Sequence, residues 1–134
     1  TEDILLTETA DRIRTLTLNR PASRNALSAE LRRRFFRALA DAEADDAVDV
    51  VIVTVFCAGL DLKELGNTTE LPDISPKWPT MSKPVIGAIN GAAVTGGLEL
   101  ALYCDILIAS EKAAFAATHA RVGLLPTWGM SVRL

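Results

Sequence analysis

The stretch VIGAINGAAVTGGLELALYCDILIA, residues 85–109, decides the fold class of this chain. Residues 85–90 form an apolar run that predicts a buried strand, and residues 106–109 predict another. Between them, residues 91–97 are rich in glycine and predict a turn, and residues 98–103 predict the start of a helix. Alternation of strands and helices predicts an α/β fold.

The same stretch is apolar enough to suggest a membrane span. Asn90, Glu99, Asp105 and four glycines interrupt it, so we expect buried elements of a globular protein and no membrane segment. Residues 1–4 show no basic segment followed by an apolar one, which argues against a secretory signal and favours a cytoplasmic protein.

The chain before this stretch follows the same alternation. Two β-prone runs at residues 4–9 and 13–18 predict a hairpin. From 29 to 45 the apolar residues recur at helical spacing behind Ser28, a good N-cap, and predict an amphipathic helix. Residues 48–54 are mostly β-branched and predict a strand covered on both faces, as in parallel sheets flanked by helices.

Two polar features are predicted to lie at the surface. Arg32, Arg33, Arg34 and Arg37 resemble a phosphate-binding patch, but such charge usually marks a solvated helix face, which is the interpretation we favour. Residues 67–84 are polar and contain four prolines, so they predict a mobile surface excursion.

Length and composition exclude several classes of protein. With 134 residues, of which 49% are hydrophobic and 23% charged, residues 1–134 are expected to form one folded domain. A net charge of -3 gives no basic surface for nucleic acid. Cys57 and Cys104 have no metal-ligand spacing, so we expect no metal site and no disulfide, and two buried thiols in a reducing cytosol.

Two loops carry the candidate chemistry. Residues 56–65 (FCAGLDLKEL) follow a predicted strand and lead into a helix, so backbone N–H groups can be left unpaired and directed at an anion. Residues 90–99 (NGAAVTGGLE) repeat the arrangement, and the two loops could converge on one oxygen. Each loop alone could equally be an ordinary glycine turn. The chain contains no GxGxxG, GxxxxGK or GxSxG pattern, which argues against dinucleotide, P-loop and serine-hydrolase sites.

Together the two loops resemble the signature of the crotonase (enoyl-CoA hydratase/isomerase) family, FxAGxDxKE followed by NGxxxGGGxEL. The resemblance covers essentially the whole chain. It implies a spiral of repeated ββα units assembled as trimers or hexamers. Further matching segments are KPVIGAIN at 83–90, CDI at 104–106, RVGLLP at 121–126, LNRP at 18–21 and NAL at 25–27.

The resemblance also implies roles for individual residues. Leu60 and Gly96 match the two backbone N–H donors that hold the thioester oxygen, the oxyanion hole. Glu99 matches the first catalytic glutamate, which positions and deprotonates the attacking water in hydratases of the family. Residues matching the stretch that contacts coenzyme A are Ala58, Leu60, Asp61, Leu62 and Lys63.

Three departures from the family pattern are visible. His119 stands where the family has its second catalytic glutamate; it could donate a proton near neutrality or merely form a structural hydrogen bond. A short segment that joins strand to loop in relatives is missing between Thr54 and Val55. Relatives continue well beyond the position of Leu134, so we expect this chain to represent only the N-terminal core and to lack the C-terminal half of the family fold.

The expected function is therefore that of an enoyl-CoA hydratase in fatty acid metabolism. The expected partner is an acyl-CoA substrate, with no separate cofactor because coenzyme A arrives as part of the thioester. Alternatives are another reaction of the family, such as double-bond isomerisation or acyl-CoA hydrolysis, and non-catalytic binding of CoA thioesters.

Overall fold

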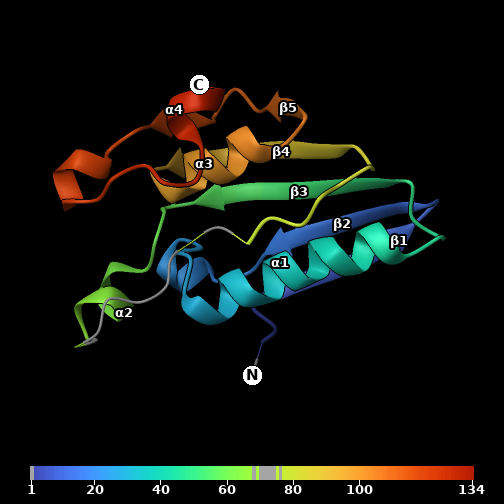
Figure 1. The fold of residues 1–134 in the computed structure, drawn as a ribbon, viewed down its shortest axis with the longest axis horizontal. Helices are drawn as coiled ribbons and strands as arrows, with labels where there is room; N and C mark the ends of the chain where they lie inside the picture. Colours follow the sequence, from blue (N-terminus) through green and yellow to red (C-terminus); the bar gives the residue numbers. More distant parts are fainter. Residues whose placement is uncertain (1, 68, 70–74, 76) are drawn as a thin grey trace.

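A computed structural model describes residues 2–67, 69, 75 and 77–134, with only the backbone described at Val55 and Phe56. The order of elements confirms the predicted α/β fold (Figure 1). The strands are β1 (Leu5–Ala10), β2 (Ile13–Leu18), β3 (Val50–Cys57), β4 (Val85–Val94), β5 (Ile106–Ala109) and β6 (Ala114–Ala116). The α-helices are α1 (Ala29–Ala44), α2 (Leu62–Gly66), α3 (Gly96–Tyr103) and α4 (Met130–Arg133), and 3-10 turns lie at Pro21–Ser23 and His119–Val122.

The strands form one sheet in the order β1-β2-β3-β4-β5. β1 and β2 are the predicted antiparallel hairpin, and the pairs from β2 to β5 are parallel. β6 pairs in parallel with the C-terminal part of β4, from Ala92 to Val94. Parallel pairing brings the C-terminal ends of β3 and β4 to the same edge of the sheet, which is where both candidate loops begin.

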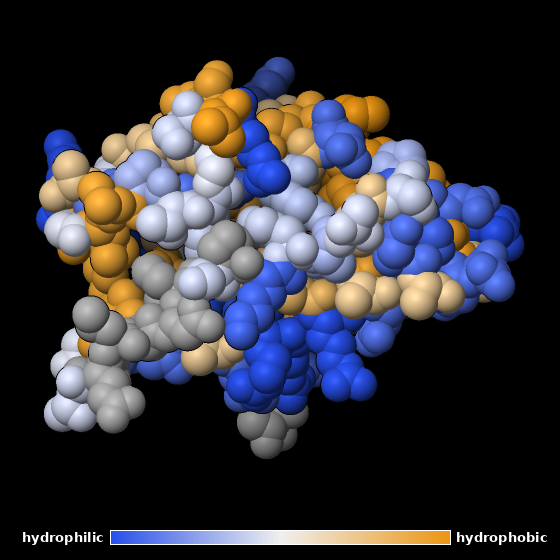
Figure 2. Space-filling view, viewed as in Figure 1, coloured by the Kyte–Doolittle hydropathy of each residue, from blue (hydrophilic) through white to orange (hydrophobic). Residues whose placement is uncertain are grey.

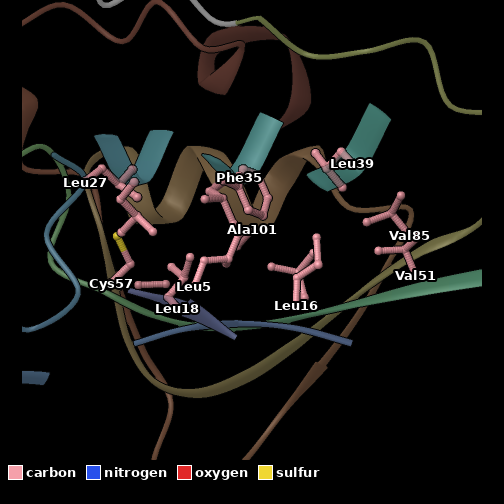
Figure 3. Close-up of a cluster of buried hydrophobic side chains, with 14 of the residues drawn as sticks. Leu5, Leu16, Leu18, Leu27, Phe35, Leu39, Val51, Cys57, Val85 and Ala101 are labelled. Atoms are coloured by element: carbon pink, nitrogen blue, oxygen red, sulfur yellow. The ribbon is translucent and has the colours of Figure 1, made fainter. Parts of the chain in front are cut away.

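The core lies between one face of the sheet and the helices α1 and α3 (Figure 3). Phe35 of α1 and Ala101 of α3 point toward Leu16 and Val51 on the strands, and all four are essentially inaccessible to solvent. Alternate residues of β3 are buried, as expected for side chains that point to opposite faces of a strand. This packing fixes the position of α3 relative to β3 and β4.

Helix α1 forms where its sequence predicts. Ser28 is the N-cap, because its side chain accepts a hydrogen bond from the Leu31 N–H at 3.2 Å. Arg33, Arg34 and Arg37 are exposed, as expected of a solvated helix face, and hydrophilic side chains cover this part of the surface in Figure 2. Arg32 corrects that expectation, since it is buried and donates to the Leu27 carbonyl at 2.9 Å.

The glycine-rich segment is the clearest correction to the predicted elements. Residues 91–97 were expected to form a turn, but β4 continues to Val94 and α3 begins at Gly96. Pairing with distant segments extends the strand, because Ala93 faces Cys57 of β3 and Val94 faces Ala116 of β6. The actual turn is confined to Thr95.

The region of the missing segment shows an irregular register. β3 runs from Val50 to Cys57 without a loop after Thr54. Val55 faces Ile89 and Cys57 faces Ala93, so two steps along β3 span four steps along β4. The short connection is therefore accommodated by a local shift in the register between β3 and β4.

Residues 67–84, predicted to form a mobile surface excursion, fall partly outside the described residues. Within this segment, Trp78 is partly buried. Its ring stacks on Tyr103 of α3 with centroids 3.9 Å apart, and it makes edge contacts with Phe36 at 4.8 Å and Trp128 at 5.9 Å. An aromatic cluster of Phe36, Trp78, Tyr103 and Trp128 thus joins α1, α3 and the segment that precedes α4.

Apolar surface gathers over α4 and β5 in Figure 2. Ile106 and Ile108 of β5 are 54% and 63% exposed. Among the described residues, no helix is long and apolar enough to cross a membrane. Cys57 is buried as predicted, whereas Cys104 is only partly buried, and both are free thiols.

Candidate active site

The two candidate loops meet at the backbone of Gly59, Leu60 and Gly96. Gly59 has a φ of +98°, a conformation that side chains rarely adopt. A Cβ atom added to Gly59 would lie 3.4 Å from the Gly96 nitrogen, and one added to Gly96 would lie 3.6 Å from the Leu60 nitrogen. The structure therefore brings together the two backbone N–H groups that the sequence proposed as donors.

The first loop is held by the segment that precedes α1. The Leu27 N–H donates to the Gly59 carbonyl at 2.7 Å, and the Asp61 N–H donates to the Leu27 carbonyl at 3.3 Å. Neither of these two bonds uses the N–H of Leu60, the residue between Gly59 and Asp61. Gly96 is the first residue of α3, where an N–H has no acceptor within the helix. Within the described part of the chain, neither of the two N–H groups donates a backbone hydrogen bond.

Asp61 fixes the end of the first loop. Its side chain caps α2 by accepting from the Glu64 N–H at 3.2 Å, and the Arg20 guanidinium lies 3.1 Å from its second oxygen. Burial by itself would raise the pKa of the Asp61 carboxyl, but these hydrogen bonds and the charge of Arg20 outweigh burial and hold the pKa below its ordinary value. The carboxylate thus braces the loop in its ionised form.

Glu99 and His119 form a buried pair beside these N–H groups. Glu99 lies in the first turn of α3 and His119 begins the 3-10 turn after β6; the two residues are 3% and 5% exposed. His119 Nε2 lies 3.1 Å from Glu99 Oε2. The other oxygen, Oε1, accepts from the Trp128 N–H at 2.9 Å and from the Met130 N–H at 3.4 Å.

The contacts of the pair assign a role to each ring nitrogen of His119. Opposite an ionised carboxylate, which only accepts hydrogen bonds, His119 Nε2 would be the nitrogen that carries the hydrogen toward Glu99. His119 Nδ1 is buried and has no hydrogen-bond partner among the described residues. Nδ1 is therefore the ring atom available to take up or release a proton.

Glu99, His119, Leu60 and Gly96 all line one cavity of about 10 Å³, roughly the room needed for one water molecule. A larger hollow of about 420 Å³ beside Tyr103 contains none of these four residues, so size alone does not identify the site. The remaining residues that line the small cavity are Thr95, Leu124, Leu125, Thr127 and Trp128.

The residues proposed to contact coenzyme A lie along one stretch from the first loop into α2. Ala58, Leu62 and Lys63 are exposed, whereas Leu60 and Asp61 are partly buried. Of this stretch only Leu60 lines the small cavity, and the other four residues lie outside it. In the described part of the chain, no three His, Cys, Asp or Glu side chains are grouped to hold a metal ion.

Sequence reasoning missed Trp128, Met130 and Thr95. Trp128 and Met130 reach Glu99 through backbone N–H groups, which every residue other than proline possesses, so their side chains give no signal. Thr95 stands where the quoted family pattern has the first of three adjacent glycines, a departure visible in the sequence, and the structure adds its unusual backbone conformation.

Comparisons with known proteins show which sequences this chain is similar to. The sequence model described as Enoyl-CoA hydratase/isomerase matches residues 8–134. The probable peroxisomal enoyl-CoA hydratase 1 of Arabidopsis thaliana is 42% identical over 132 residues, covering 91% of this chain and 50% of the relative. The 2,3-dehydroadipyl-CoA hydratase of Escherichia coli strain K12 is 37% identical over 141 residues, covering 97% of this chain and 55% of the relative.

Solved structures show the same fold. A crystal structure of an enoyl-CoA hydratase from Mycobacterium tuberculosis H37Rv superposes with a TM-score of 0.92 at 77% identity, covering 98% of this chain and 59% of that one. One from Mycobacterium smegmatis gives 0.90 at 75% identity, covering 98% and 58%. This likeness confirms the expected crotonase-like fold.

The chain spans about half the length of the curated relatives it matches. The alignment with the Escherichia coli relative also extends over more positions than the 134 residues of this chain, so that relative has residues which this chain lacks within the aligned region.

Proposed function

Because the chain belongs to the enoyl-CoA hydratase/isomerase family, we propose that it adds water to a 2-enoyl-CoA thioester. The observation that carries the proposal is that a buried carboxylate–imidazole pair, Glu99 and His119, lines the same small cavity as Leu60 and Gly96. The lining thus combines two backbone N–H groups with a buried carboxylate–imidazole pair.

The Leu60 and Gly96 N–H groups are the proposed oxyanion hole. Addition of water at C3 of the enoyl group pushes negative charge onto the thioester oxygen. Backbone donors held in place before the reaction stabilise this charge without reorganisation, and removal of one such donor typically costs a factor of about 100 to 1,000 in rate. The close approach of the two loops at Gly59 supports this assignment.

His119 is the proposed proton carrier and Glu99 its partner. Water adds its oxygen to C3 while His119 Nδ1 accepts its proton, and the same proton is then delivered to C2, so the imidazole ends each cycle unchanged. Glu99 accepts from His119 Nε2 and holds the ring, and it stabilises the imidazolium formed in between. Three hydrogen bonds already engage the Glu99 carboxylate, which favours this holding role over direct attack on water.

Hydrolysis of the thioester is the second candidate, because a carboxylate–imidazole pair beside an oxyanion hole can also direct water at the acyl carbon. Incubation with crotonyl-CoA distinguishes the candidates. Loss of enoyl absorbance without release of free thiol supports hydration, and thiol release supports hydrolysis. Binding without either change supports the non-catalytic alternative and would refute the proposed function.

We also propose an assembly of three or six copies in the cytoplasm, acting on fatty acyl thioesters and requiring no cofactor beyond the coenzyme A of the substrate. The exposed apolar side chains of β5 support burial against further protein surface. The names of two relatives assign those proteins to the peroxisome and to mitochondria, so membership of the family does not by itself define the compartment. Analytical ultracentrifugation and cell fractionation test these two points.

A further inference from the structure

Thr95 occupies a backbone conformation that a threonine rarely adopts. Its φ of 54° and ψ of -113° lie in a region favoured by glycine, and a branched Cβ makes that region still less favourable. The family signature has glycine at this place. Thr95 directly precedes Gly96, so its dihedral angles decide where the proposed second oxyanion donor points.

Three hydrogen bonds hold Thr95 in this conformation. Its N–H donates to the Ala116 carbonyl at 2.8 Å, and its carbonyl accepts from the Glu99 N–H at 3.1 Å. Its hydroxyl lies 2.7 Å from the hydroxyl of Thr118. Thr95 is 6% exposed, so water does not compete strongly for these bonds. The threonine side chain thus gains a partner that glycine at this position could not have.

Thr118 is the residue immediately before His119 and the N-cap of its 3-10 turn. The hydroxyl pair therefore links the loop that carries the Gly96 N–H to the turn that carries the imidazole. We propose that Thr95 is a positioning residue that sets the separation between the oxyanion hole and His119. The inference rests on the proposed function and adds to it a second contact, besides that of Glu99 with His119, between the element that carries Gly96 and the turn that carries His119.

The chemistry requires such a link. The thioester oxygen and the carbon atoms that react with water are held at fixed distances by the covalent structure of the substrate. The Gly96 N–H and the His119 imidazole must match that spacing to within about 0.5 Å. A misplacement of about 1 Å can reduce the rate on the order of 100-fold. Gly96 and His119 lie on separate elements, and the Thr95–Thr118 pair joins these elements in addition to the Glu99–His119 contact and the pairing of β4 with β6.

A nucleophilic role for Thr95 is less well supported. An activated hydroxyl needs a hydrogen bond to its base. The Thr95 hydroxyl bonds Thr118, and His119 Nδ1 has no hydrogen-bond partner among the described residues. The hydroxyl pair therefore acts as a structural link.

The test uses five variants of the full chain, one of which, Thr95→Ser, keeps the hydroxyl. Thr95→Val keeps the shape and removes the hydroxyl, Thr118→Val removes its partner, and the double variant removes both. Thr15→Val, a half-buried threonine on β2 away from the cavity, is the matched control. Each protein is assayed with crotonyl-CoA for kcat and KM, and its affinity for acetyl-CoA is measured by calorimetry.

We expect each single variant to lower kcat by about 10-fold to 100-fold with little change in KM, and the double variant to be no worse than either single one, because both remove the same link. Thr95→Ser should recover most of the activity and Thr15→Val should match the parent. The pH profile of kcat should change in both valine variants, since the environment of His119 changes.

Failure of the inference can be distinguished from failure of the proposed function. If the parent hydrates crotonyl-CoA and both valine variants keep its kcat and pH profile, the positioning role of Thr95 is wrong. Additive losses in the double variant would also contradict it. If the parent does not hydrate crotonyl-CoA, the proposed function fails, and the link is then tested by the NMR signals of the His119 imidazole: shifts in both valine variants support it and unchanged signals overturn it.

Discussion

His119 Nε2 and Glu99 Oε2 lie 3.1 Å apart in a region where both residues are more than nine-tenths buried. A buried pair of this kind experiences little competition from water, so each group orients the other. The Glu99 carboxylate is further restrained by the N–H groups of Trp128 and Met130. The pair is therefore held in place before any substrate binds. Substitution of His119 and substitution of Glu99 should have different effects on kcat and on substrate affinity.

Replacing His119 with alanine is expected to lower kcat by a factor of about 100 to 10,000, the usual contribution of general acid–base catalysis. The variant should also have a different pH–rate profile, because the proposed proton carrier is gone. His119→Glu should restore activity by supplying a carboxyl group at the same place. Parental kcat with an unchanged profile in His119→Ala would instead leave Glu99 working alone.

Replacing Glu99 with glutamine should separate binding from chemistry. The amide is nearly the same size and can still accept from the Trp128 N–H, so affinity for a CoA thioester should remain within about twofold. The charge that stabilises an imidazolium is lost, and kcat should fall by about two to four orders of magnitude. Calorimetry and steady-state kinetics measure the two effects. An unchanged kcat would remove Glu99 from the mechanism and leave His119 to act without it.

Replacing Leu60 with proline should abolish turnover in a protein that still folds, because proline has no N–H to offer the thioester oxygen. Leu60→Ala keeps the N–H and serves as the matched control, with a mild effect expected. Circular dichroism checks the fold of both variants. Equal activities in two folded proteins would show that the backbone of Leu60 is not a donor.

The Asp61 carboxylate, which accepts from the Glu64 N–H and pairs with Arg20, should make stability depend on pH in the acidic range. The folded-state pKa of Asp61 lies below its ordinary value of 3.8, so the carboxylate stabilises the folded protein above that pH. This contribution is lost as the pH falls through the folded-state pKa. Asp61→Asn retains a capping side chain and lacks the charge, so its free energy of unfolding should fall less than that of the parent between about pH 5 and pH 2. Parallel curves would contradict the ion-pair role.

The two thiols should resist alkylation near neutral pH in the folded protein. Burial raises the pKa of Cys57 to about 11, and burial together with the charge of Asp105 raises that of Cys104 to about 12. The thiolate is the reactive form, so iodoacetamide should label both thiols much faster after unfolding. Mass spectrometry after timed labelling measures this difference. Rapid labelling of Cys57 in the native protein would indicate that the first loop opens.

Much of the fold could be predicted from local patterns. The hairpin strand at residues 13–18, the N-cap at Ser28 and the strand at residues 106–109 coincide with the structure, because short-range periodicity and capping chemistry decide them. The segment 91–97 was misassigned because its glycine content predicts a turn, whereas its conformation depends on pairing with β6, more than twenty residues further along the chain.

For the site, the sequence by itself determined the residue types and the two loops: glycines beside Leu60 and Gly96, a glutamate in the first turn of α3, and a histidine where the family has a second glutamate. Only the tertiary structure decided which atoms meet. Parallel pairing of β3 and β4 brings the loops together, packing of α3 buries Glu99, and the chain after β6 returns to place His119 and the Trp128 N–H on opposite oxygens of that carboxylate. Local sequence cannot specify such contacts, because they depend on backbone groups that all residues share and on separations of twenty residues or more.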